Sequence, residues 1–147
     1  MQEHDPDFGF FWALDDAIMV GQSTVPRMTL ATADAVHARV DRLLAARRDE
    51  VQRMGGLMIL HDWRSLEAYD REARQRFIDK SRSRGRGYLR ASIVAVRASP
   101  LIRMALQTGN MLLSVFLGVS IEVIDDPTSK VRALGLVAPA PGATFPA

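Results

Sequence analysis

One stretch of the sequence is the strongest indicator of the fold: Leu57-Met58-Ile59-Leu60-His61-Asp62-Trp63-Arg64-Ser65. Its first four residues are apolar without interruption, which is typical of a strand covered on both faces of a sheet. Ser65 is a residue type that caps helices. The residues after it place apolar side chains on one helical stripe: Leu66, Tyr69, Ala73 and Phe77. The stretch therefore predicts a buried strand that leads into a helix, the unit from which parallel α/β sheets are built.

Upstream of this stretch the sequence predicts a hairpin and a long helix. The apolar runs 8–14 and 17–21 are separated by Asp15-Asp16, and aspartate tolerates the positive φ angles of a tight turn. Apolar residues then recur at near-helical spacing: Val36, Val40, Leu43, Leu44 and Val51. Thr29 or Thr32 is available as the N-cap of this helix, and Gly55-Gly56 as its stop.

Downstream, residues 91–96 and 119–124 predict two more strands. Pro100 suits the first turn of the helix between them, Gly118 suits its end, and Asp125-Asp126-Pro127 opens a last short helix. In the predicted order two strands come first, and helices and strands then alternate up to the last short helix. We therefore expect an α/β fold in one domain: a mixed β-sheet, with an N-terminal antiparallel hairpin and then parallel strands, covered by about four helices.

The length of 147 residues suits one domain. We expect an acidic N-terminal tail at 1–7, the domain at 8–134 and a flexible tail rich in Ala, Pro and Gly at 135–147. The acidic start lacks the cationic region of a signal peptide, so the expected location is cytoplasmic. Residues 104–121 carry no charge, but polar residues interrupt them, which favours a buried helix and strand over a transmembrane span.

The chain resembles the STAS domain of bacterial anti-sigma-factor antagonists and the related SpoIIAA-like proteins. The resemblance rests on this element order, on the stretch 57–65 and on the strand Ser92-Ile93-Val94-Ala95-Val96. The resemblance implies a non-enzymatic regulatory protein that binds partner proteins, nucleotides or lipids. In the antagonists a serine at the start of the helix after the third strand is phosphorylated. If Asp62 closes the strand, the family's Asp-Ser-Ser-Gly motif falls at Asp70-Arg71-Glu72-Ala73, which has no hydroxyl. Ser65 is then the candidate phosphorylation site, and a plain helix cap is the simpler interpretation.

Catalytic and metal patterns are weak. His61, Asp62 and Ser65 have the residue types of a catalytic triad, but consecutive strand residues point to opposite faces and no Gly-x-Ser-x-Gly elbow is present. His4, His37 and His61 are far apart in the sequence, and the chain has no cysteine, so no metal site is expected. Gly85-Arg86-Gly87 lacks the third glycine of a dinucleotide loop, and no cofactor is expected. An enzyme that uses His61 or Asp62 stays an alternative.

Charge is concentrated in one segment. Residues 71–90 contain eight basic and two acidic residues, although the whole chain has a formal net charge of only +2. Arginine, which suits bidentate contacts with phosphate and carboxylate, supplies 17 of the 19 basic residues. We expect a binding surface for a partner protein or a small anionic, lipid-like ligand. Its expected residues are Asp62, Trp63, Arg64, Ser65, Arg82, Arg84, Arg86 and Arg90. The acidic remainder argues against nucleic acid, and a solvated basic helix end is the simpler alternative.

The segment 101–124 has more apolar residues than one stripe of a surface helix needs. They include Met104, Leu106, Met111, Leu112, Leu113, Phe116 and Leu117. Packing on the sheet, a self-association surface that gives a homodimer, and a pocket for an acyl chain are the three interpretations. Together these patterns predict a binding or regulatory module rather than an enzyme.

Overall fold

The computed structural model describes residues 2–97 and 100–135 of the chain. The main sheet contains β1 (Gln2–Asp5), β2 (Gly9–Leu14), β3 (Ile18–Ser23), β5 (Leu57–Asp62), β7 (Leu89–Ala95) and β8 (Ile121–Ile124). The helices are α1 (Leu30–Ala46), α2 (Arg48–Arg53), α3 (Arg71–Arg84), α4 (Pro100–Leu117) and α5 (Pro127–Ala133). Two further short strands, β4 (Arg27–Met28) and β6 (Ala68–Tyr69), pair with each other.

The main sheet is mixed, as predicted. Its strand order is β1-β2-β3-β5-β7-β8. The pairs β1–β2 and β2–β3 are antiparallel, and the pairs from β3 to β8 are parallel. The chain therefore forms a single compact α/β domain in which strands and helices alternate after the N-terminal hairpin.

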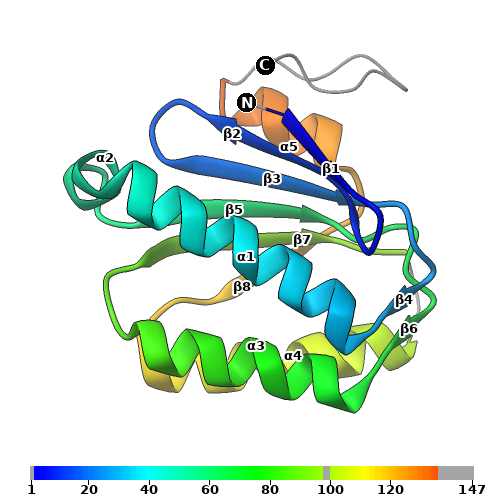
Figure 1. Ribbon diagram of the computed structural model, residues 1–147. Coiled ribbons are helices and arrows are strands. Elements are labelled where there is room, and N and C mark those ends of the chain that lie inside the picture. The colour runs from blue at the N-terminus through cyan, green and yellow to red at the C-terminus, as the bar shows by residue number, and fades with distance from the viewer. Residues whose placement is uncertain (1, 98–99, 136–147) are drawn as a thin grey trace.

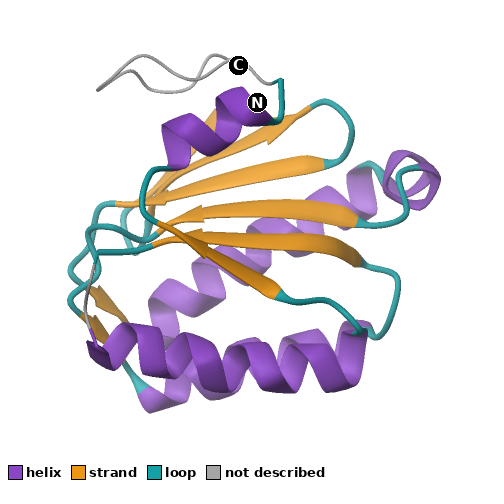
Figure 2. Ribbon diagram, turned by 180° about the vertical axis from the view of Figure 1, so that it is seen from behind, coloured by secondary structure: helices purple, strands orange, loops and turns teal. Residues whose placement is uncertain are grey.

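Helices cover the two faces of the sheet unequally. Helix α1 crosses one face and α5 crosses the other, while α3 packs beside α1 and α4 beside α3 (Figures 1 and 2). Residues on each strand alternate between the faces: Ile59 belongs to the core on the α1 side, and Leu60 belongs to the core on the α5 side. Because helices cover both faces of the sheet, every residue of β5 is buried, as its uninterrupted apolar run predicted.

The predicted hairpin is confirmed. Asp16 and Ala17, between β2 and β3, have φ angles of 62° and 54°, which few residues other than glycine adopt. The Glu50 carboxylate accepts hydrogen bonds from both of their amides, at 2.9 Å and 3.4 Å. A distant acidic side chain therefore stabilises the strained turn.

Three predicted helix ends are also confirmed. Thr29 caps α1 by accepting a hydrogen bond from the Thr32 amide, and Asp126 caps α5 in the same way through Thr128. Gly118 follows α4 with a φ of 67°. The long helix expected up to Gly55 is instead divided at Arg47 into α1 and α2.

Two local predictions were wrong. Ser65 does not cap a helix, because α3 begins at Arg71 and residues 66–70 pair with the segment around β4: the amides of Ala68 and Asp70 donate to the carbonyls of Pro26 and Met28. Residues 2–5 of the expected acidic tail form β1, and Glu3 there makes ion pairs with Arg39 and Arg42 of α1. The expected tail 135–147 lies, from residue 136 onward, outside the described residues.

Within residues 2–97 and 100–135, no helix combines the length and the apolar character needed to cross a membrane.

Candidate functional site

A cavity of about 270 Å³ lies under α1, α3 and α4, on the face of β5, β7 and β8 that these helices cover. We call it the inner cavity. A cavity of about 150 Å³ is known to hold a benzene molecule, so this one has room for a small organic ligand. Its volume is slightly below the range of about 300–1,000 Å³ that is usual for ligand pockets.

The walls of the inner cavity are mostly apolar. Its aliphatic and aromatic lining comes from each surrounding element and includes Val36, Ile59, Val94, Leu106, Leu113 and Phe116. Three exposed lining residues, Arg71, Gln75 and Thr108, lie on α3 and α4. The mouth of the cavity is therefore between these two helices.

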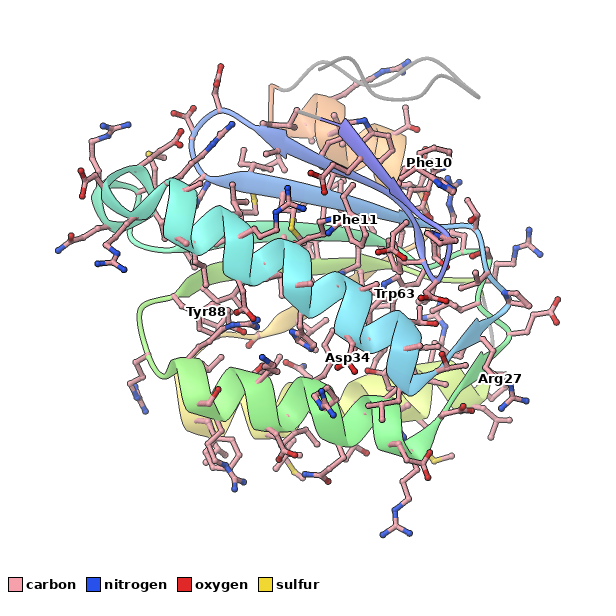
Figure 3. The ribbon with its side chains drawn as sticks, viewed as in Figure 1. Phe10, Phe11, Arg27, Asp34, Trp63 and Tyr88 are labelled. Carbon is pink, nitrogen blue, oxygen red and sulfur yellow. The ribbon has the colours of Figure 1, made fainter. Side chains whose placement is uncertain are left out.

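Aromatic rings gather around Phe77 at one end of the inner cavity. The Phe77 ring centroid is 4.5 Å from that of His37, 5.6 Å from that of Trp63 and 6.5 Å from that of His61. Tyr69 lies 5.5 Å from Trp63 and 6.2 Å from Phe77. Figure 3 shows Trp63 on the side of the sheet where α1 and α3 pack. Residues from α1, β5 and α3 thus meet at this end.

Four nitrogen atoms of cavity-lining side chains are buried without a hydrogen-bond partner among the described residues. They are His37 Nε2, His61 Nδ1, Trp63 Nε1 and Arg74 Nε. The side chains of His37, His61 and Trp63 are only 4%, 6% and 3% exposed. Buried polar groups in folded proteins are nearly always paired with protein or water, so these four nitrogens are available to bind a ligand or water in the cavity.

The tautomer of His37 follows from its contact with Arg84. Arg84 Nη1 lies 3.1 Å from His37 Nδ1, and arginine carries donors only. His37 Nδ1 therefore accepts, and the proton of the neutral ring is on Nε2. We call His37 Nε2, Trp63 Nε1 and Arg74 Nε the donor cluster, since all three carry a hydrogen and none has a partner among the described residues.

Burial keeps both cavity histidines uncharged. It lowers the pKa of His61 to about 4. Burial, with the positive charges of Arg84 and Lys80, lowers the pKa of His37 to about 3. At neutral pH each ring is therefore a neutral donor and acceptor, and Arg71 and Arg74 supply positive charge to the lining.

The predicted residues around Asp62 do not form one site. Trp63 lines the inner cavity, but Asp62 is on the opposite face of β5 from His61 and binds Arg64 with two contacts of 2.9 Å. Ser65 Oγ lies 2.9 Å from Ser23 Oγ and from the carbonyls of Ser23 and Val25. The Ser65 hydroxyl thus joins the loop after β5 to the loop after β3, where a phosphate would displace these contacts.

The four predicted arginines are also separated. Arg84 lines the inner cavity, whereas Arg82 lies on the outside with its guanidinium 4.6 Å from the Phe116 ring centroid. Arg86 is exposed, and Arg90 donates to the carbonyls of Ala17, Gly56 and Asp16. Arg90 therefore holds the β2–β3 turn against β5.

Other cation contacts reduce the free positive charge of segment 71–90. Arg76 pairs with Asp34, and Lys80 and Arg84 pair with Asp41, all across the α1–α3 contact. Much of the basic segment thus serves helix packing.

Sequence reasoning missed His37, Tyr69, Arg74 and Phe77 as site residues. His37 lies between the buried Val36 and Val40 on the predicted helix stripe, which was the available signal. The expected absence of a metal site stays a prediction, and the described residues contain no group of three or more His, Asp or Glu side chains placed to hold one.

Helix α4 divides its apolar residues between two sides. Leu106, Leu112, Leu113 and Phe116 line the inner cavity. Leu101, Met104, Met111 and Val115 are 58–72% exposed. The excess of apolar residues in this segment is therefore explained in part by the cavity and in part by an exposed stripe.

No protein-family model matches the chain, and no curated protein matches it.

Proposed function

We propose that the protein is a non-catalytic binding module that holds a small amphipathic ligand in the inner cavity. The observation that carries the proposal is the combination of apolar walls with four unpartnered buried nitrogens in the lining. Apolar pockets with a few convergent polar groups are the usual form of small-molecule sites. A regulatory role, in which the ligand changes a partner interaction, agrees with the resemblance to STAS and SpoIIAA-like proteins.

The polar and the apolar end of the ligand would lie in different parts of the inner cavity. The polar end would lie near Trp63, just after the carboxyl end of β5, where open α/β sheets commonly bind ligands. The apolar end would lie along α4, against Leu112, Leu113 and Phe116. The site differs from the expected surface of Asp62, Arg64 and Ser65, and shares with the predicted residues only Trp63 and Arg84.

Octanoate and octan-1-ol, two amphiphiles with the same chain, test the proposal through the melting temperature of the full chain. At least one of them should raise Tm, because a ligand that binds only the folded state stabilises it. Gly109 offers a matched pair of variants, since it lines the cavity and the nearest atom to an added Cβ, Ile121 Cδ1, is 4.0 Å away.

Gly109→Leu should fill the cavity and abolish the rise in Tm, whereas Gly109→Ala should keep it. If neither amphiphile stabilises the protein, or if Gly109→Leu responds as the wild type does, the proposal is wrong.

An enzyme that uses His61 is the second candidate. The observation that favours it is the buried, unpartnered Nδ1 of His61 in the cavity lining; the lowered pKa of about 4 makes His61 a weak base at neutral pH. In D₂O, a ligand that co-purifies with the protein would then gain mass by deuterium exchange after incubation with the wild type and keep its mass after incubation with His61→Gln. An unaltered mass in both cases would overturn this candidate.

A further inference from the structure

We infer that the inner cavity selects a monocarboxylate: an apolar body with one carboxylate, which is held by the donor cluster of His37 Nε2, Trp63 Nε1 and Arg74 Nε. This inference rests on the proposed function and adds the chemical class of the ligand.

Three of the four unpartnered nitrogens can only donate in this structure. The indole of Trp63 and the guanidinium of Arg74 have no acceptor. His37 uses its Nδ1 to accept from Arg84, so its Nε2 carries the hydrogen. A ligand group that only accepts hydrogen bonds complements this set, and an ionised carboxylate is such a group.

The surroundings favour an anion over a neutral acceptor. Arg74 and Arg71 both belong to the cavity lining, which contains no acidic side chain among the described residues. Hydrogen bonds to a charged group are about twice as strong as those between neutral groups, and a buried charge needs several of them. The donor cluster supplies three.

The size and the walls favour a single small apolar body. The cavity measures about 270 Å³, and its far end consists of aliphatic and aromatic side chains from α4 and β8, including Leu113, Phe116 and Ile121. Two further polar atoms of the lining are already paired with each other: Ser81 Oγ lies 3.2 Å from Tyr88 Oη. One polar head and one apolar tail therefore match the cavity.

The test compares octanoate, octan-1-ol and octylamine, which share one chain and differ in the head group. Calorimetric titration of the full chain should give octanoate the lowest Kd, with octylamine at least tenfold weaker because the donor cluster repels a cation. Trp63→Phe keeps the ring and removes one donor, so it should weaken octanoate about tenfold and octan-1-ol much less.

Trp12→Phe is the matched control. It makes the same chemical change in the core on the α5 side of the sheet, and it should leave the Kd of octanoate unchanged. Arg74→Met, which keeps the aliphatic stem, should reduce the preference of the protein for octanoate over octan-1-ol.

The outcomes separate this inference from the proposed function. Binding of octan-1-ol as tight as that of octanoate, or equal losses for both in Trp63→Phe, would overturn the carboxylate and leave the amphipathic ligand in place. If none of the three compounds binds, the inference and the proposed function both fail.

Discussion

Arg84 Nη1 of α3 lies 3.1 Å from His37 Nδ1 of α1. The same guanidinium reaches Asp41 Oδ1 at 2.7 Å, and the Arg84 side chain is only 9% exposed. This contact joins two helices beside the inner cavity and directs the remaining N–H of His37 away from Arg84. Arg84, which belongs to the basic segment, therefore sets which nitrogen of His37 carries the hydrogen, although no sequence motif singled out His37.

Removal of this contact should cost more than removal of a neighbouring surface arginine. Arg84→Ala leaves the buried His37 Nδ1 without its donor and removes a second contact to the His37 carbonyl, so the free energy of unfolding should fall by about 1–3 kcal/mol. Arg82→Ala, the control, removes only an exposed stack on Phe116 and should cost at most about 1 kcal/mol. Urea unfolding measures both, and equal losses would contradict the role given to Arg84.

Stability should fall as the pH drops below the ordinary pKa of histidine. In the unfolded chain His37 and His61 take up a proton near pH 6.5, whereas in the folded protein their pKa values are lowered to about 3 and about 4. The unfolded state therefore binds more protons below pH 6.5, and each histidine should contribute a slope of about 1.4 kcal/mol per pH unit.

Urea unfolding between about pH 5 and pH 6 measures this slope in a range above the usual titration of carboxylates. His61→Gln should remove about half of the slope, because only His37 then remains as a buried neutral histidine. A variant with the wild-type slope would show that His61 is not buried as a neutral ring.

Gly56 should tolerate no side chain. Its φ is +124°, and an added Cβ would lie 2.7 Å from the Arg90 amide nitrogen and 2.8 Å from the Leu89 carbonyl carbon. Gly56→Ala should therefore destabilise the protein by about 2–5 kcal/mol through strain and overpacking at the start of β5.

The neighbouring Gly55 provides the control for this prediction. Its φ is also positive, at +77°, but nothing lies within 4 Å of an added Cβ. Gly55→Ala should cost only about 1 kcal/mol, from backbone strain alone. Thermal unfolding of the two variants would refute the close approach at Gly56 if their Tm values agreed.

The Asp62–Arg64 pair should not affect ligand binding. Its two 2.9 Å contacts lie on the other face of β5 from the inner cavity, so Asp62→Asn should leave the Kd of octanoate unchanged. The pair should contribute about 1 kcal/mol or less to stability, since the Arg64 side chain is 42% exposed. A large change in Kd would mean that the two faces of β5 are coupled.

The amino-acid sequence alone was sufficient to predict the strands, helix ends and side-chain directions that depend on neighbouring residues. The uninterrupted apolar run 57–60 predicted a strand buried on both faces. Gly118 and the segment Asp125-Asp126-Pro127 predicted helix ends, and of the two candidate N-caps, Thr29 and Thr32, the structure shows Thr29. The opposite directions of His61 and Asp62 also followed from the strand period alone. Such features are local, because a cap or an alternation needs only the few residues around it.

The residues of the candidate site could be identified only from the three-dimensional structure. The inner cavity joins His37 of α1, Trp63 after β5 and Arg74 of α3, and their approach depends on how α1 and α3 pack on the sheet. Another contact between distant segments, the pairing of β6 with β4, leaves Ser65 in a loop, where it contacts Ser23 and Val25 and does not cap a helix. Spacing along the chain reports side-chain periodicity, but it does not report which distant nitrogens are buried together without a partner.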